Sequence, residues 1–279
     1  MSQFTLCAYR RWWIFAAILI VAGIAAVPVA SIVHHMVDRA VGRTTVAKDA
    51  DGTERTVYWR EYPGVAGIDS QQVMEGPTPQ RGYDAGQPMI AEIQAALSEE
   101  FQLEWAPVSD TGGGSPFHRP IENHYGGESL LTTVNGPESQ STTVPRTWEE
   151  KQRALSIIGE VTRRHGYEAP TIDGLESWSA EDRIRDLGGL TPDKQVIVSG
   201  VALGRAGQWL SFRFQDLSKD TDRTFQERLR PPEGSQCKMD TLALSYGANG
   251  LLAAEDRHEF ESRLEPFRGL PPEPLESIP

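Results

Sequence analysis

The sequence predicts an α+β fold: a two-layer sandwich in which an antiparallel sheet carries two helices on one face, preceded by one transmembrane helix. Three observations lead to this prediction. An uncharged apolar run of 22 residues lies at Trp12–Val33. Two later segments, Pro88–Phe101 and Trp148–His165, have the periodicity of helices. Short segments with the alternating pattern of strands follow each of them, and strands joined by turns usually pair antiparallel.

The apolar run Trp12–Val33 is long enough to cross a membrane, since a helix needs about 20 apolar residues to span a bilayer core. Arg10 and Arg11 stand directly before it, and positive charge favours the cytoplasmic side of a membrane. We therefore predict a cytoplasmic stub at residues 1–11 and a membrane-spanning helix at 12–33. Residues 34–279 would then lie on the extracytoplasmic side of the membrane.

A cleaved signal peptide is the alternative interpretation of this run. Such a peptide has an apolar region of about 7–15 residues followed by a cleavage site of small residues. The run here is longer, and cleavage after Ala30 would leave Pro28 at an unfavourable position. A lipoprotein anchor is disfavoured because it needs a cysteine after the apolar run, and Cys7 precedes it.

The charge of the outer part argues against two kinds of partner. Arg10 and Arg11 are the only charged residues among the first 33, so the 27 basic and 39 acidic residues of the chain leave a net charge of −14 for positions 34–279. Nucleic acids and anionic lipid headgroups are both bound through basic surfaces. We expect no nucleic acid partner and no electrostatic adhesion to the membrane surface.

The two cysteines, Cys7 and Cys237, would lie on opposite sides of the membrane and could not pair. The fold is therefore not expected to be a disulfide scaffold. Cys237 would be an unpaired thiol that is either buried or joins two chains into a homodimer.

Residues 34–87 are predicted to form a juxtamembrane linker. Within it, Thr44–Val46 and Thr56–Trp59 flank the turn signal Asp51-Gly52, a pattern that allows a small hairpin. Residues 62–88 are rich in Gly, Pro and Gln and lack hydrophobic periodicity, so we expect them to be mostly irregular.

The predicted outer domain spans residues 88–265 and begins with the helix Pro88–Phe101. Its apolar side chains recur at helical spacing, at Ile90, Ile93, Leu97 and Phe101. Two strands are expected next, at Leu103–Trp105 and Ser129–Val134, with a polar loop between them.

The second helix, Trp148–His165, has the clearest boundaries. Thr147 and Glu150 have the spacing of a capping box, and Gly166 is suited to the helix end. A shorter helix is expected at Ala180–Leu187, because Ser179 and Asp182 have the same capping spacing.

Three strands and a helix complete the predicted domain: Lys194–Ala202, Gln208–Gln215, Met239–Tyr246 and Ala253–Leu264. In the middle strand, Leu210, Phe212 and Phe214 share one face. Trp209, Ser211 and Arg213 share the other. The last residues, 266–279, form a proline-rich tail that is expected to be extended.

A family resemblance rests on five of these stretches. They are the anchor near the membrane, the passage from helix to tryptophan strand at Ile90–Trp105, the helix Trp148–His165, the aromatic strand Gln208–Gln215 and the tail motif Leu270–Pro274. In this order the chain resembles actinobacterial cell-envelope proteins of the LppA lipoprotein type and their membrane-anchored relatives. It departs from the lipoprotein pattern because no cysteine follows its apolar run. The resemblance implies a location at the cell envelope, and it implies neither an activity nor a site residue.

One loop could carry chemistry. His118 and His124 share it with Asp110, Glu122 and Glu128, and imidazole with carboxylate ligands would suit zinc. The sequence has neither an HExxH motif nor a cysteine pair to accompany them, and it lacks a complete phosphate loop and a Gly-x-Ser-x-Gly elbow. We therefore predict no catalytic, cofactor or metal site. An envelope hydrolase or metal-dependent enzyme that uses the His118–Glu128 loop is the alternative.

Trp209, Arg213 and Trp178 are the candidates for an interaction face, since aromatic residues and arginine are favoured at binding hot spots. Ordinary packing is the competing explanation for these side chains. Together the patterns predict a single-pass, membrane-anchored extracytoplasmic protein that binds an envelope protein or a small ligand without catalysis. A purely structural component, dimeric through Cys237, is a further alternative.

Overall fold

The computed structural model of the protein describes residues 43–48, 51–106, 115–119, 121–174, 178–229 and 239–272. The predicted membrane span Trp12–Val33, both cysteines and Asp110 lie outside these residues. Among the helices that the structure describes, none combines the length and the apolar character needed to cross a bilayer.

The protein is an α+β structure with an antiparallel main sheet, as the sequence predicts. Among the described residues, seven strands form this sheet, and every pairing within it is antiparallel. In spatial order they are β3 (Phe117–His118), β6 (Leu131–Asn135), β11 (Thr241–Leu252), β10 (Gln208–Gln215), β9 (Ile197–Leu203) and β8 (Thr171–Ile172), with β7 (Ser139–Gln140) paired to β11.

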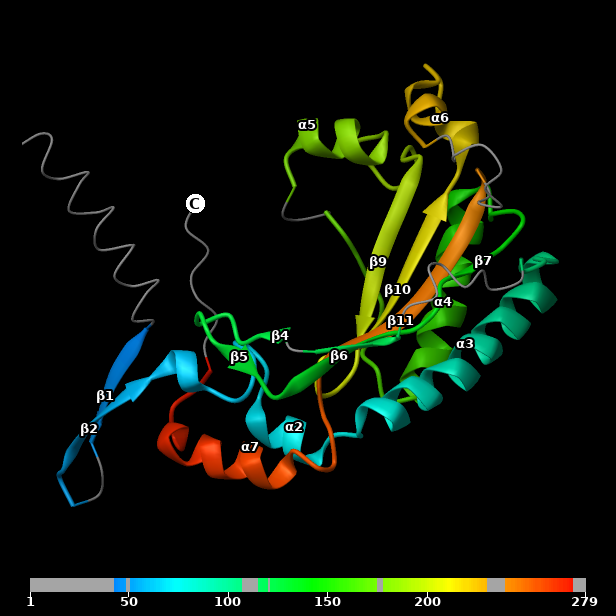
Figure 1. Ribbon diagram of the computed structural model, residues 1–279. Helices are drawn as coiled ribbons and strands as arrows, with labels where there is room; N and C mark the ends of the chain where they lie inside the picture. Colours follow the sequence, from blue (N-terminus) through cyan, green and yellow to red (C-terminus); the bar gives the residue numbers. More distant parts are fainter. Residues whose placement is uncertain are drawn as a thin grey trace, which may run out of the picture.

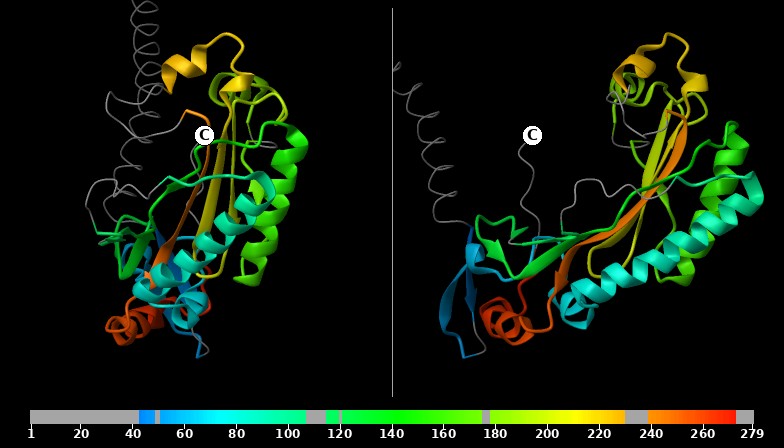
Figure 2. Two further views of the ribbon diagram at one scale, coloured as in Figure 1. Left: turned by 90° about the vertical axis from the view of Figure 1, so that its right-hand side faces the viewer. Right: turned by 45° about the vertical axis from the view of Figure 1, so that its right-hand side comes forward.

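Two helices, α3 (Pro79–Phe101) and α4 (Trp148–Arg164), lie against one face of this sheet (Figures 1 and 2). The main hydrophobic core fills the space between them and the strands. It includes Ile93 and Leu97 of α3, Ile158 of α4, and Leu210, Phe212, Phe214, Leu242 and Leu244 of the sheet. The apolar alternation of β10 therefore points toward the helices, as predicted.

Helix α4 forms where its capping box predicts. The Glu150 amide donates to Thr147 Oγ1 at 3.1 Å, and the Thr147 amide donates to the Glu150 carboxylate at 2.9 Å. These reciprocal bonds satisfy two amides that the first turn of a helix leaves without partners. The helix ends at Arg164, and Gly166 follows with φ of 85°.

Helix α3 begins at Pro79, well before the predicted start at Pro88, which lies inside the helix. The region expected to be irregular also contains α2 (Ser70–Glu75), capped by the Asp69 carboxylate. The glycines that obscure the helical pattern have a packing role. A Cβ atom at Gly86 would lie 2.0 Å from the ring of Tyr246, so α3 can approach β11 only with glycine there.

Three other elements differ from the prediction. The expected strand Leu103–Trp105 is reduced to one bridge between Trp105 and Ser141. Strand β11 continues past Tyr246 to Leu252, because its second half pairs with β6. The last helix, α7 (Arg257–Leu264), begins later than Ala253. The short helix at 180–187 is present as α5 (Ala180–Asp182) and a π-helical turn (Arg183–Leu187). A further short helix, α6 (Thr224–Arg228), lies between β10 and β11.

The described part of the predicted linker is packed against the rest of the molecule. Strands β1 (Thr44–Lys48) and β2 (Glu54–Tyr58) form the expected hairpin, which turns at Gly52 with φ of 87°. A hydrophobic cluster follows, in which the aromatic side chains of Trp59, Tyr62, Tyr125 and Phe267 pack together with Val57. Tyr125 lies in the turn of the small hairpin formed by β4 (Ile121–Glu122) and β5 (Glu128–Ser129), and Phe267 belongs to the predicted tail. These aromatic residues lie far apart in the sequence and form no periodic pattern, yet the fold buries them together.

Candidate functional site

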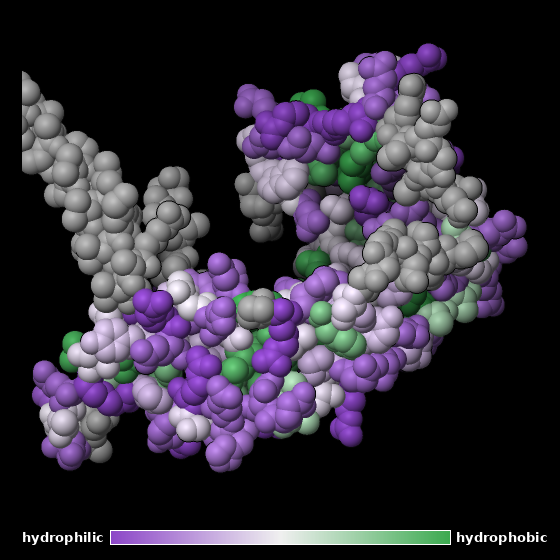
Figure 3. Space-filling model, in the orientation of Figure 1, coloured by the Kyte–Doolittle hydropathy of each residue, from purple (hydrophilic) through white to green (hydrophobic). Residues whose placement is uncertain are grey.

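The predicted interaction residues of β10 lie on the sheet surface that faces away from α3 and α4. We call this surface the open face and define it by Ser199, Trp209, Ser211, Arg213 and Ser245. The register places Ser211 opposite Ser245, and Arg213 opposite Ser199. In space-filling form the molecule is hollowed between the part with α5 and α6 and the part with β1, β2 and α7 (Figure 3). The open face looks into this hollow (Figures 1 and 2).

Trp209 is held in one orientation on the open face. Its ring lies over Gly247, where an added Cβ would be 2.5 Å from the ring edge. Its indole Nε1 donates a hydrogen bond to Asn249 Oδ1 at 3.1 Å. The glycine below and the amide beside it fix a partly exposed aromatic surface on the sheet.

Arg213 has only a loose partner among the described residues. Its Nη2 lies 3.8 Å from Glu138 Oε1, and both side chains are about 40% exposed (43% and 39%), so the pair contributes little to stability. Its Nε is buried without a hydrogen-bond partner. Beside it, the hydroxyls of Ser211 and Ser245 bond each other at 2.7 Å. The centre of the face thus offers short hydroxyls and a guanidinium that is not tightly held.

The structure separates Trp178 from Trp209. Trp178 is 39% exposed and packs against Gly174, in the segment between β8 and α5. Strand β8 runs antiparallel to β9, so the chain that leaves β8 heads toward the start of β9. Trp209 instead pairs with Leu203 at the end of β9. The two tryptophans therefore belong to opposite ends of the face.

A pocket of about 390 Å³ adjoins the Trp209 end of the open face. We call it the Asn249 pocket. Its walls come from four segments and consist of Val65, Ala66, Ile68, Ile121, Glu122, His124, Thr133 and Asn249. Asn249 belongs to both features, because it lines the pocket and accepts the hydrogen bond from Trp209. Asn249 therefore connects the ring of Trp209 to the pocket.

Residues of the predicted catalytic loop surround this pocket. Glu122 and His124 line it, and His118 is the register partner of Thr133 in its wall. Side chains of paired residues lie side by side on one face of a sheet, so His118 emerges near the rim. Glu128 pairs with Glu122 across the β4–β5 hairpin. Within the described ranges, no three His, Cys, Asp or Glu side chains are grouped closely enough to hold a metal ion.

The pocket walls depend on a buried residue that sequence reasoning missed. The Asn123 side chain is fully buried, and its Nδ2 lies 3.0–3.2 Å from the carbonyl oxygens of Trp59, Arg60 and Tyr62. Its Oδ1 accepts from the amides of Tyr125 and Gly127 at 2.8 and 3.0 Å. These bonds join the β4–β5 turn to residues 59–62. The positive φ angles of His124 (64°) and Gly126 (84°) show the tight turn that they hold.

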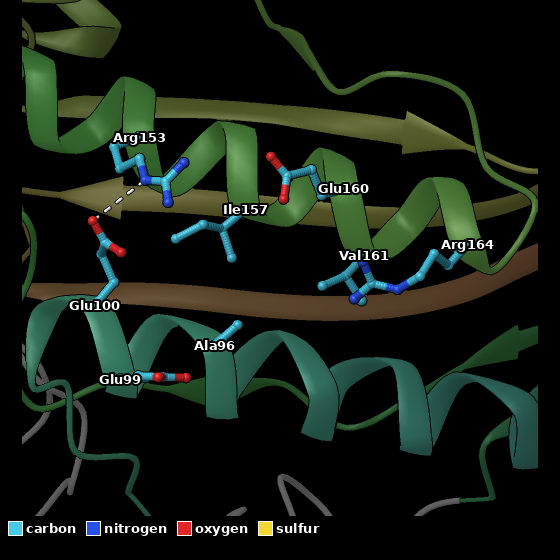
Figure 4. A pocket seen from close by; sticks show the side chains of 8 residues that line it. All are labelled: Ala96, Glu99, Glu100, Arg153, Ile157, Glu160, Val161 and Arg164. Carbon is cyan, nitrogen blue, oxygen red and sulfur yellow. Dashed lines mark hydrogen bonds and ion pairs between the residues drawn. The ribbon is translucent and has the colours of Figure 1, made fainter.

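A second hollow, of about 300 Å³, lies between α3 and α4 on the far side of the helices. Ile157, Val161 and Ala96 line it together with charged side chains, and Arg153 reaches across to Glu100 at 3.3 Å (Figure 4). Glu160 also lines the hollow and accepts a hydrogen bond from the Ser156 hydroxyl of its own helix at 3.4 Å. Arg164, which also lines it, is bonded to Glu92 outside the hollow. The basic groups of the hollow thus already have acidic partners, so we regard it as a helix seam and not as the site.

No family model, no curated protein and no solved structure matches this chain. The resemblance to LppA-type envelope proteins therefore stays a prediction.

Proposed function

We propose that this protein is a single-pass, membrane-anchored protein of the cell envelope whose extracytoplasmic domain binds a ligand or partner on the open face. The anchor in this proposal is the apolar run Trp12–Val33, and its direction follows from Arg10 and Arg11. The resemblance to LppA-type proteins points to the same location.

The observation that carries the binding function is the junction of the Asn249 pocket with the ring of Trp209. Ligand sites combine mostly apolar walls with a few polar groups that fix orientation. Val65, Ile68 and Ile121 supply the apolar walls here, and the polar groups include Thr133 and Asn249. Nothing comparable supports the helix seam, where the charged side chains dominate.

Binding is favoured over hydrolysis because of what surrounds the two histidines. A catalytic imidazole is expected within hydrogen-bond reach of a nucleophile or of the group that orients it. No hydrogen bond or ion pair joins His118 or His124 to such a group among the residues that the structure describes. We therefore assign Glu122 and His124 to ligand contact.

The membrane topology gives the first prediction. Val46 lies on β1 and is 64% exposed, so a cysteine there would be accessible to reagents. In a Cys237→Ser background, Val46→Cys should react with a membrane-impermeant maleimide in intact cells, whereas Cys7 should react only after lysis. Gel shift of the full chain measures both reactions.

The Cys237→Ser protein without the second substitution is the matched control, because it retains Cys7 alone. Labelling of Cys7 in intact cells, or protection of Val46→Cys until lysis, would contradict the proposed orientation. Recovery of Val46→Cys in the soluble fraction would instead show that the apolar run is cleaved.

Binding at the open face gives the second prediction. Leu203 shares the face with Trp209 and is 52% exposed, so a photoreactive benzoylphenylalanine there should not disturb the core. Irradiation of cells that express this variant should give a defined adduct. The same reagent at Ser156, an exposed position of α4 on the other side of the molecule, should give none. The adduct should also weaken when Trp209→Ala is added.

An adduct of equal intensity at Leu203 and Ser156 would mean non-specific contact and would contradict a binding site on the open face. Absence of any adduct at Leu203 would have the same consequence. An adduct of unchanged intensity in the Trp209→Ala variant would show that the partner binds elsewhere than at Trp209 and the Asn249 pocket.

A further inference from the structure

The ring of Trp209 has the geometry of a stacking platform. It lies against Gly247 and is fixed at its edge by Asn249, and it remains partly exposed on the sheet surface that faces away from the helices. A rigid aromatic face attracts C–H groups that carry partial positive charge, because the π-system is negative on its face. The axial C–H groups of a pyranose ring form such a surface.

The groups around the platform are suited to hydroxyl groups. Within the pocket, Asn249, Thr133 and Glu122 supply amide, hydroxyl and carboxylate functions, and Ser211 and Ser245 continue the polar surface along the sheet. Arg213 adds a planar guanidinium that is partly exposed and held only by the loose contact of its Nη2 with Glu138. Such planar and short polar side chains can donate to and accept from adjacent hydroxyls of one ligand.

The charges near the site select among ligand classes. Glu122 in the pocket and Glu138 beside Arg213 would repel an anionic ligand, and the charge of −12 for the whole chain acts in the same sense. A cationic ligand would meet Arg213 on the face. A purely apolar ligand would cover Glu122 and Thr133 without bonding to them, which costs free energy because both groups lose water. A neutral polyhydroxylated ligand avoids all three conflicts.

We infer that the Asn249 pocket and the ring of Trp209 bind a neutral carbohydrate, with one sugar ring stacked on the indole and its hydroxyls bonded by Asn249, Thr133 and Glu122. The inference rests on the proposed binding function and adds the class of ligand. The elongated open face, with Ser211 and Arg213 beyond the platform, suits an oligosaccharide of several sugar units.

The test uses the full chain in detergent and a panel of soluble hexose oligomers: neutral glucans, mannans and galactans, with polygalacturonate as the acidic counterpart. Isothermal titration calorimetry should detect binding of at least one neutral oligomer and weaker or no binding of the acid. Trp209→Ala should weaken that binding about tenfold or more, the loss expected for one aromatic contact. Trp209→Phe should retain most of it, since the ring remains.

Tyr58→Ala is the matched control, because Tyr58 is an exposed aromatic residue (44%) on the β1–β2 hairpin and outside the pocket. It should leave binding unchanged, and circular dichroism of each variant should match the wild type. No binding of any neutral oligomer, or binding indifferent to Trp209→Ala, would overturn the inference. If the Leu203 photo-adduct still forms in that case, the binding function stands and only the ligand class is wrong; if neither is seen, both proposals fail.

Discussion

Replacing Asp216 with alanine is expected to lower the free energy of unfolding by about 3–5 kcal/mol, because it leaves a buried ammonium without its partner. Lys151 Nζ lies 2.8 Å from Asp216 Oδ2, and the two side chains are 1% and 0% exposed. Lys151 belongs to α4, and Asp216 directly follows β10. The pair therefore joins the helix layer to the sheet at the end of the main core.

The carboxylate of Asp216 is held as an anion by several donors. Burial alone raises the pKa of Asp216, but hydrogen bonds from Lys151, Ser218 and Arg146 outweigh it and keep the pKa below its ordinary value. Arg146 donates to Asp216 at 2.9 Å and also pairs with Asp240 at 2.9 Å. Loss of Asp216 would thus affect a network that spans α4, β10 and the start of β11.

Urea unfolding, followed by tryptophan fluorescence of the full chain in detergent, measures this effect. Glu100→Ala is the matched control, since the Arg153–Glu100 pair has side chains that are 52% and 40% exposed. Exposed pairs contribute about 0–1 kcal/mol, so this variant should remain close to the wild type. A Lys151→Met/Asp216→Leu double variant should recover part of the loss, because no buried charge is left unpaired. An Asp216→Ala protein as stable as Glu100→Ala would refute the structural role.

The burial of Lys151 could not be predicted from the sequence. The helix α4 could be predicted because its capping box and its apolar repeat are local features. The same pattern treats Lys151 as an exposed polar position, yet the helix buries it, since its partner is 65 residues away in the sequence. The early start of α3 was missed for a related reason. Gly82 and Gly86 weaken a helical pattern locally, but they permit contact with Leu251 and Tyr246 of a distant strand.

The candidate site was predictable in its parts and not in its assembly. Alternation in β10 was enough to place Trp209 and Arg213 on the face opposite the core. Proximity in the sequence was enough to group Glu122 with His124. The sequence does not show that these two groups of residues lie next to each other. Their proximity depends on the path of β11 beyond Tyr246, which brings Asn249 to the pocket, and on the loop at Val65, which forms another wall. Neither feature has a periodic signal, because both depend on long-range contacts.

Replacing Asn123 with aspartate is the second change expected to have a large effect, a loss of about 3 kcal/mol or more in the free energy of unfolding. The substitution preserves the shape of the side chain but replaces the hydrogen-bond donor Nδ2 with an acceptor oxygen. The amide Nδ2 donates to the carbonyls of Trp59, Arg60 and Tyr62, and a carboxylate oxygen there would face three acceptors without a proton to share. Its burial prevents water from relieving that repulsion.

Because Asn123 joins the β4–β5 turn to residues 59–62, we expect the loss to be felt in the Asn249 pocket as well. Glu122 and His124 flank Asn123 in the chain and line that pocket. Urea unfolding should therefore show a lower midpoint, and a limited protease should cut the variant near residues 59–66 before the wild type. Ligand contact at the open face should weaken together with these changes.

Asn249→Asp is the matched control, because it tests whether the loss of stability comes from the burial of the carboxylate or from the amide-to-carboxylate change itself. It makes the same amide-to-carboxylate change at an exposed position of the same pocket, and its Oδ1 can still accept the bond from Trp209 Nε1. Its stability should stay within about 1 kcal/mol of the wild type, since surface substitutions away from buried networks have small effects. If both variants lose stability equally, the pocket as a whole is sensitive to added negative charge. If only Asn123→Asp unfolds early, the buried amide is what holds the pocket walls together.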